Sequence, residues 1–246
     1  MQSELDNQRI LIPGLYNLRD LGGMKTKDGS TTVSHRLVRS DALDHISGSS
    51  IDSLVSYPVE VVIDLRSEEE ASNHPDTIAS DPRFKYYNIP LLRINADDIN
   101  TGVITDTIST SLGHLYVWMF ENSKAYFAEV LRTILKEKGK TVLFHCAHGK
   151  DRTGLIAAIF YLLCDVDRKA IIDNYAISYT YVKELVAPLI ASTPENVHHI
   201  YRSDASNMER LLAHLDNAYQ GDIRNFLSSC GITGEEISEL RSILLP

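Results

Sequence analysis

Residues 145–154 read His-Cys-Ala-His-Gly-Lys-Asp-Arg-Thr-Gly, and this stretch decides how the rest of the chain is organised. The preceding residues 141–144 are largely apolar and predict a short buried strand. Residues 155–163 are apolar almost throughout and predict a helix. A loop that enters a helix in this way presents backbone N–H groups at the helix N-terminus, where anions bind readily. The sequence therefore predicts a phosphate-binding loop with a cysteine in its floor.

Length and composition place the chain among globular enzymes. Its 246 residues are 43% hydrophobic and 23% charged, which is sufficient to build a core without disulfides or a structural metal. The formal net charge of −9 argues against non-specific nucleic-acid binding, which requires a basic surface. No run approaches the ~20 apolar residues of a membrane helix, so we expect no integral membrane segment. We also expect one domain over residues 1–246.

The cysteines and the N-terminus indicate the compartment. Three cysteines, Cys146, Cys164 and Cys230, form an odd and sparse set that is not a disulfide framework, which favours a reducing compartment. The polar residues 1–9 contain no apolar segment of the kind found in signal peptides. We therefore expect a cytoplasmic location, with signal-less secretion left open.

Apolar runs alternate with helical patterns along the first part of the chain, and helical patterns fill the rest. This order predicts an α/β fold with a central, mostly parallel sheet flanked by helices and a helical C-terminal part. Ser50 is expected to cap its helix, and Pro188 and Pro194 to interrupt the C-terminal helices near a candidate lid. Residues 91–113 are expected to be a functional lid or partly disordered. Strands are predicted at 9–12, 33–38, 59–65, 84–89 and 141–144, and helices at 50–57, from 67, and at 125–138, 155–163, 170–186, 208–219 and 235–245.

The loop contains the groups that cleavage of a phosphomonoester requires. A free thiol has a pKa of ~8.5, and a helix N-terminus with a nearby cation lowers it to ~3.5–7.5, which creates a nucleophilic thiolate. Cys146 has both features, because the helix begins near Arg152. Thr153 is placed to donate its hydroxyl to the thiolate. The guanidinium of Arg152 suits bidentate phosphate binding. The expected phosphate-binding residues are Ala147, His148, Gly149, Lys150, Asp151 and Arg152.

Three other interpretations of the loop are weaker. A nucleotide-binding P-loop requires an earlier glycine and a Ser or Thr directly after the lysine, whereas Asp151 follows Lys150 here. A zinc site built on His145, Cys146 and His148 has ligands crowded along the chain and no paired Cys/His cluster elsewhere. A merely structural cysteine leaves the arginine six positions later unexplained.

The pattern His-Cys-x-x-Gly-Lys-Asp-Arg-Thr-Gly resembles the signature of the cysteine-dependent tyrosine phosphatases. It is most similar to the bacterial and fungal branch, whose loop contains Lys-Asp-Arg. That branch also carries Asn-Leu-Arg-Asp-Leu-Gly-Gly, here residues 17–23, then Arg-Ser, here Arg39 and Ser40, and Asp-Leu-Arg, here residues 64–66. The resemblance covers roughly residues 10–245 and implies a tyrosine-phosphatase-like fold.

The resemblance also implies the chemistry. Cys146 is expected to be the nucleophile that forms a phosphocysteine, and Arg152 the phosphate clamp. The implied enzyme is metal-independent and without a cofactor, with inorganic phosphate as product and inhibitor. Its implied specificity is dual, and phosphotyrosine, phosphoserine or phosphothreonine in proteins, and phosphoinositides are all candidate substrates. Lys150 beside His148 could recognise a second phosphate on an inositol ring, and a catalytically silent phosphate-binding module is the remaining alternative.

The position of the general acid differs from that in the wider family. The acid there usually lies in a Trp-Pro-Asp loop, but the only tryptophan here, Trp118, has no Pro-Asp after it. Asp151 is the first candidate, because the resembling branch also places an aspartate in the loop. A structural alternative for Asp151 is an ion pair or the cap of the helix. Its functional role would be to protonate the leaving oxygen.

Two further positions remain candidates for the acid. Asp64 ends a predicted strand that faces the same site, and its structural alternative is to pair with Lys150 or Arg152. The third candidate is either of two aspartates in the unassigned stretch, Asp97 or Asp98.

Overall fold

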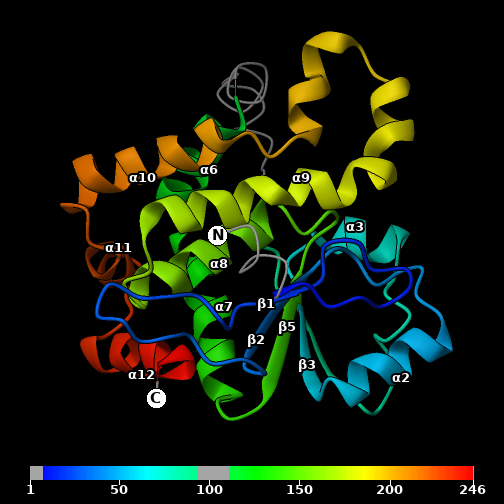
Figure 1. Cartoon of the computed structure of the whole chain (residues 1–246), viewed down its shortest axis with the longest axis horizontal. Helices are drawn as coiled ribbons and strands as arrows, with labels where there is room; N and C mark the ends of the chain where they lie inside the picture. The colour runs from blue at the N-terminus through cyan, green and yellow to red at the C-terminus, as the bar shows by residue number, and fades with distance from the viewer. Residues whose placement is uncertain (1–7, 93–110, 246) are drawn as a thin grey trace.

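A computed structural model of the chain describes residues 8–92 and 111–245 (Figure 1). Within these residues a five-stranded sheet has the order β1-β2-β5-β3-β4. Strand β1 (Arg19–Asp20) pairs antiparallel with its neighbour, and the other pairs are parallel. The predicted mostly parallel sheet is confirmed. The parallel strands are β2 (Leu37–Ser40), β3 (Val59–Asp64), β4 (Lys85–Asn88) and β5 (Thr141–His145).

Helices cover both faces of the sheet, and strand alternation explains how each face obtains its core. In β3, Val61 and Ile63 join the larger apolar cluster, whereas Val62 joins the smaller one on the opposite face. The smaller cluster includes Leu54 of α2 (Gly48–Ser56). The larger one contains residues of α6 (Leu112–Asn122), α7 (Lys124–Lys136), α8 (Arg152–Leu163), α10 (Ala205–Tyr219), α11 (Ile223–Ser229) and α12 (Gly234–Leu244).

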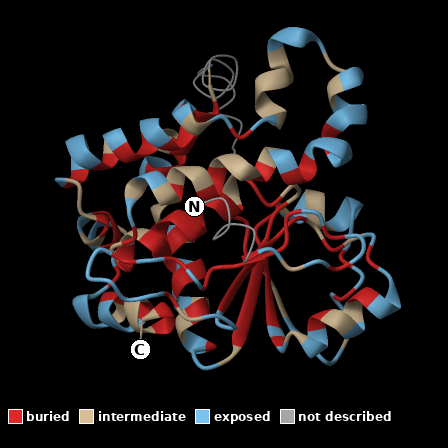
Figure 2. Cartoon of the chain, viewed as in Figure 1, coloured by how far each residue is buried: buried red, intermediate tan, exposed pale blue. Residues whose placement is uncertain are grey.

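Helix α8 is the central helix of the larger layer and is buried along nearly its whole length (Figure 2). It packs against β2 and β5 on one side and against α9 (Arg168–Ala191), α11 and α12 on the others. A helix enclosed on all sides has no polar stripe, which explains why its sequence is apolar all round. The C-terminal helices therefore hold α8, and with it the loop that precedes it, against the sheet.

The structure corrects several local predictions. Residues 9–12 form only isolated bridges, Arg9 with Arg19 and Ile12 with Leu15, and no strand. Helix α2 begins earlier than predicted, because Ser47 rather than Ser50 is its cap and accepts a hydrogen bond from the Ser50 amide.

Helix α9 continues through Pro188 instead of ending there. Proline removes one backbone hydrogen bond, but the carbonyl that loses its partner belongs to the exposed Glu184, so water can replace it. Strand β1 and helix α6 were not predicted, and α11 and the 3-10 helix η1 (Glu195–Tyr201) lie in the part predicted to be helical but were given no bounds. Most of the stretch 91–113 lies outside the described residues, so its interpretation as a lid stays a prediction. None of the described helices is both long and apolar enough to cross a membrane.

Candidate active site

The cysteine loop lies where the sequence placed it, between the end of β5 and the start of α8. Cys146 follows the last residue of β5 and is 2% exposed, and Arg152 is the first residue of α8. The carboxyl ends of β2, β3 and β5 meet at this edge of the sheet. Ligands of open parallel α/β sheets bind outside the carboxyl ends of the strands. Topology alone therefore puts Cys146 at the binding edge.

The carbonyl groups of the loop are held from behind. Asn17 donates through Nδ2 to the carbonyl oxygens of His148 and Gly149, each at 3.0 Å. Arg39 donates through Nη2 to the Gly149 oxygen at 2.7 Å. Carbonyl groups that are bonded on the protein side leave the amide N–H groups of the loop to serve an anion. The loop is therefore braced as an anion cradle.

Glycine at position 149 is required by both conformation and space. Its φ is +65°, in the left-handed region, and a Cβ there would lie 2.4 Å from the carbonyl oxygen of Ser40. The loop thus touches the end of β2, where the Ala42 amide also donates to the Ala147 oxygen at 3.1 Å. A side chain at this position would push the loop off the strand.

Two arginines lie fully buried beneath the loop, and their role was not predicted from the sequence. Arg19 and Arg39 face each other across β1 and β2. Arg19 donates to the Asn174 carbonyl, to Asn17 Oδ1 and to Ser178 Oγ, and Arg39 donates to Asn174 Oδ1. All of these acceptors are neutral. Burial lowers the pKa of Arg39 to about 10, so the group remains a cation at neutral pH. The sequence did carry one signal for these residues, because an arginine within a segment that pairs as a strand is unusual and indicates a buried, bonded side chain.

Arg152 is oriented by a carboxylate whose role was not predicted from the sequence. Its Nη1 and Nη2 donate to Glu70 Oε2 at 2.6 Å and Oε1 at 2.8 Å. Burial opposes the charge of Arg152, but the bonds to Glu70 and the nearby Cys146 raise its pKa above the usual range. The pKa of Glu70 falls to about 2, because the bonds to Arg152 outweigh its own burial. Arg152 is thus a fixed cation beside the cysteine.

Glu70 is itself fixed by the start of helix α3 (Glu68–Asn73). The Ser67 amide donates to Glu70 Oε2 at 2.8 Å, and the Glu70 amide donates to Ser67 Oγ at 3.0 Å. This is a capping box, and the Ser-x-x-Glu spacing that produces it is visible in the sequence. The spacing was the signal that could have identified Glu70 as a rigidly held side chain.

Lys150 and Asp151 pair with each other. Lys150 is 1% exposed, and its Nζ lies 2.9 Å and 2.6 Å from Asp151 Oδ1 and Oδ2 and 2.8 Å from the Ile200 carbonyl oxygen. An ammonium group has three donors, and these acceptors account for them. Asp151 stands at the N-cap position of α8 but makes no side-chain capping bond. Of its two structural alternatives, the geometry therefore favours the ion pair over the cap.

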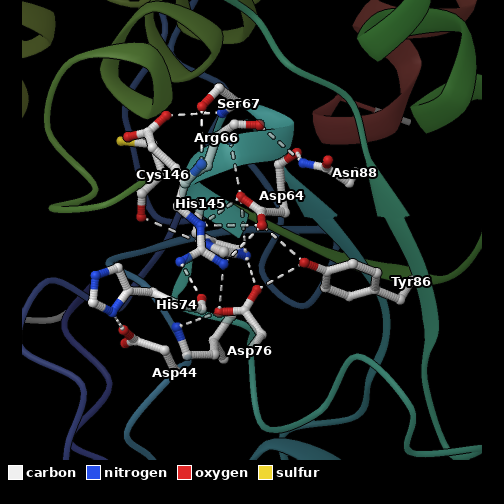
Figure 3. A network of polar contacts seen from close by, with 12 residues as sticks. Asp44, Asp64, Arg66, Ser67, His74, Asp76, Tyr86, Asn88, His145 and Cys146 are labelled. Carbon is white, nitrogen blue, oxygen red and sulfur yellow. Dashed lines mark hydrogen bonds and ion pairs between the residues drawn. The ribbon is translucent and has the colours of Figure 1, made fainter. Parts of the chain in front are cut away.

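Asp64 points into a buried network beneath the loop (Figure 3). Its oxygens accept from Arg66 Nε and Nη2 at 2.8–3.0 Å and from Tyr86 Oη at 2.8 Å. The structure does not pair Asp64 with Lys150 or Arg152, and its side chain is 0% exposed. Asp97 and Asp98, the third candidates for the acid, lie outside the described residues.

His145 joins the same network directly behind Cys146 (Figure 3). Its Nε2 lies 3.0 Å from Asp76 Oδ2, a charge contact in which Nε2 makes no well-aligned hydrogen bond. Burial opposes protonation of His145, but Asp76 outweighs it and raises the pKa of the imidazole, while the pKa of Asp76 is lowered. Among the described residues His145 shares a ligand cluster with Asp64 and Asp76 rather than with Cys146. This arrangement does not support the zinc alternative.

His148 differs from His145 in its charge. Burial and then the neighbouring Lys150 lower the pKa of His148 to about 4, so its ring is neutral at neutral pH. The ring therefore adds no charge to the loop.

A cavity of about 680 Å³ opens beside the loop. Asp151 and Arg152 form one end of it, and Glu68, Glu69 and Glu70 of α3 form one wall. The apolar part of its lining consists of Pro90, Leu92, Leu112, Leu115 and Met119. A site with a fixed cation at one end and an apolar wall can hold an aryl group that carries an anion.

Residues 10–246 match the model of the tyrosine phosphatase family. The chain belongs to that family. A tyrosine-protein phosphatase of Nostoc commune is 32% identical over 217 residues, which cover 83% of this chain and 72% of that protein. A relative from Cupriavidus necator is 28% identical over 65% of this chain and 59% of its own length. The crystal structure of TpbA from P. aeruginosa covers 91% of this chain and 95% of its own, with 16% identity and a TM-score of 0.46. The family membership makes this chain a cysteine-dependent phosphatase.

Proposed function

We propose that this phosphatase hydrolyses phosphotyrosine in proteins through a phosphocysteine intermediate on Cys146. The observation that carries the proposal is the braced loop, whose carbonyl groups are bonded from behind while Arg152 stands fixed beside the cysteine. Glu70 takes two of the five N–H donors of Arg152, which leaves three for phosphate oxygens. Such a site stabilises the charge of a transferring phosphoryl group.

In the first step the Cys146 thiolate attacks phosphorus, the S–P bond forms and the bond to the tyrosyl oxygen breaks. Asp151 gives its proton to that oxygen. In the second step a water molecule attacks the phosphocysteine, the P–S bond breaks, and Asp151 takes the proton from water. Inorganic phosphate leaves and inhibits by occupying the same cradle. The hydroxyl of Thr153 is buried and forms no hydrogen bond with a described residue, Cys146 included, so its role as donor to the sulfur is proposed from its place in the loop alone.

Asp151 is preferred as the acid because it lines the cavity next to Arg152. Asp64 remains an alternative, but its arginine and tyrosine partners support a structural role below the loop. An acid must reach the leaving oxygen directly or through one water. The side chain that already borders the cavity meets this condition with the smallest movement.

Phosphoserine, phosphothreonine and phosphoinositides are alternative substrates. The phosphoinositide alternative relied on Lys150 as the ligand of a second phosphate. Because the three donors of Lys150 already have acceptors, the site favours one phosphate carried on an aromatic group that packs on the apolar wall. A long tyrosyl group also reaches a recessed cysteine more easily than a serine phosphate.

A substrate panel tests the proposal. Wild type, Cys146→Ser and Asp151→Asn are compared on phosphotyrosine, phosphoserine and phosphothreonine peptides and on phosphoinositide vesicles. We expect the highest kcat/KM on phosphotyrosine and no turnover by Cys146→Ser, which should still bind the peptide. A higher kcat/KM on the vesicles would replace the proposed substrate class, and turnover by Cys146→Ser would refute the mechanism.

A further inference from the structure

The hydroxyl groups of two buried tyrosines form a chain that ends on Asp151. Tyr116 in α6 and Tyr175 in α9 are 0% and 1% exposed, and their rings meet edge-on with centroids 5.8 Å apart. The Tyr116 hydroxyl donates to Asp151 Oδ1, and the two tyrosine hydroxyls lie 2.7 Å apart. We infer that Tyr116 is a positioning residue for catalysis, which holds Asp151 Oδ1 so that Oδ2 carries the proton delivered to the leaving group. This inference rests on the proposed role of Asp151 as the acid.

The two oxygens of Asp151 are not equivalent. Oδ1 accepts from both Tyr116 and Lys150, whereas Oδ2 accepts from Lys150 alone. A carboxylic acid needs one oxygen to hold the proton, and the oxygen with fewer donors around it is the one that can do so. When the proton lies on Oδ2, its bond from Lys150 must open, while the bond from Tyr116 to Oδ1 can persist. Tyr116 therefore fixes the rotation of the carboxyl group during proton transfer.

Tyr116 is well suited to act as a permanent donor. Burial, and next the charge of Asp151, raise the pKa of its phenol well above the usual range, so it keeps its proton throughout the working pH range. A buried hydroxyl that has found its partners is costly to displace. Tyr116 thus serves as a neutral donor and does not itself supply the proton to substrate.

The rest of the chain of bonds anchors the tyrosines to the fold. Asn207 in α10 donates through Nδ2 to the Tyr175 hydroxyl at 3.3 Å. Its Oδ1 accepts from the Gly113 amide at 3.0 Å and from Ser111 Oγ at 3.1 Å, at the start of α6. The hydrogen bonds thus tie α6, α9 and α10 together before they reach the loop. The network that joins α6, α9 and α10 therefore also sets the direction of the Asp151 carboxylate.

Tyr116→Phe tests the inference, because it removes one hydroxyl and keeps the ring. Tyr161→Phe is the matched control, since Tyr161 is also fully buried but its hydroxyl accepts from Gln8 and does not touch Asp151. Both variants are made in wild type and in Asp151→Asn. Kinetics are measured on phenyl phosphate, which has a poor leaving group, and on 4-nitrophenyl phosphate, which has a good one, across a range of pH.

We expect Tyr116→Phe to lower kcat on phenyl phosphate about 10-fold and on 4-nitrophenyl phosphate less than about 3-fold, since acid catalysis contributes most where the leaving group is poor. In the Asp151→Asn background the same substitution should leave kcat unchanged on both substrates. Tyr161→Phe should have the same kcat on both substrates as the protein into which it is introduced, wild type or Asp151→Asn.

The outcomes separate the two proposals. If Asp151→Asn slows phenyl phosphate selectively but Tyr116→Phe does not, or if Tyr116→Phe has the same effect with and without Asp151, the positioning role is refuted and the proposed acid stands. If Asp151→Asn itself shows no dependence on the leaving group, the acid is wrong and the inference falls with it. A loss of melting temperature shared by Tyr116→Phe and Tyr161→Phe, with equal losses of kcat, would also overturn the inference.

Discussion

Glu70→Gln tests whether the orientation of Arg152 is set by helix α3. The substitution keeps the size of the side chain and removes its charge. One amide oxygen remains as an acceptor, but the NH₂ group cannot accept from arginine. The paired contacts of 2.6 Å and 2.8 Å are therefore reduced to one neutral contact. We expect Arg152 to lose its fixed direction and the phosphoryl transition state to lose part of its stabilisation.

The size of the effect follows from the exposure of the pair. Hydrogen bonds to charged groups contribute about 1.5–3 kcal/mol when buried. The Glu70 side chain is 40% exposed, and solvent weakens such pairs to about 1 kcal/mol or less. The Arg152 side chain is only 14% exposed, so an intermediate loss of about 1–2 kcal/mol is expected. This corresponds to a fall of roughly 5- to 30-fold in kcat/KM.

Steady-state kinetics on a phosphotyrosine peptide measure this loss. Glu69→Gln is the matched control, since Glu69 is an exposed carboxylate one residue earlier in the same helix, whereas the ion pair of Arg152 is with Glu70. The control should change kcat/KM less than twofold, in line with about 0.4 kcal/mol or less for an exposed charge. Equal losses in the two variants would show that the wall acts only through its total charge, and no loss in Glu70→Gln would refute the orientation of Arg152 by Glu70.

Three further substitutions probe the support of the loop. Gly149→Ala should lower both melting temperature and activity, because a left-handed alanine costs about 1–2 kcal/mol and its Cβ meets Ser40; unchanged activity would contradict the close approach. Arg39→Met should raise the inhibition constant of inorganic phosphate about 10-fold through loss of the buried cation and of its bond to the loop. Asp76→Asn should destabilise the fold by about 3 kcal/mol in urea titrations, since it removes the buried carboxylate charge that faces both His145 and Arg66.

The loss of folding stability caused by Asp76→Asn depends on pH. The pKa of Asp76 is lowered from 3.8, so its contribution is present above pH 3.8 and is lost as the pH falls further. The pKa of His145 is raised from 6.5, so its contribution is present below pH 6.5 and is lost as the pH rises through the folded value. The destabilisation should therefore be largest between pH 3.8 and 6.5. A constant difference from pH 3 to pH 8 would contradict the pairing.

The sequence predicted the sheet and the loop because these depend on local patterns. β3 is a run of β-branched residues, and the helix after the loop is apolar all round, so their places were readable from periodicity. Helix α6 was missed because its apolar residues, including Tyr116 and Met119, follow a polar stretch and carry no charged face to mark a period. Its burial arises from contact with α10, a segment some ninety residues later in the chain.

The supporting residues of the site were harder to predict for the same reason. Cys146 and Arg152 lie in one continuous loop, so their spacing shows their relation directly. Glu70, Tyr116 and Arg39 reach the loop from other elements, and no spacing in the sequence connects them to it. Asp64 was placed correctly at the end of a strand, but whether it faces the cavity or the layer beneath depends on Arg66 and on Tyr86 in the next strand.

Cys146 is the proposed carrier of the phosphoryl group, and trapping the phosphocysteine tests this role without reference to any particular acid. The enzyme is mixed with a phosphotyrosine peptide and quenched in acid within the first turnover, and its peptides are analysed by mass spectrometry. We expect one added phosphoryl group on the peptide that contains Cys146, and none in Cys146→Ser. A phosphoryl group on a different residue, or full turnover by Cys146→Ser, would contradict it.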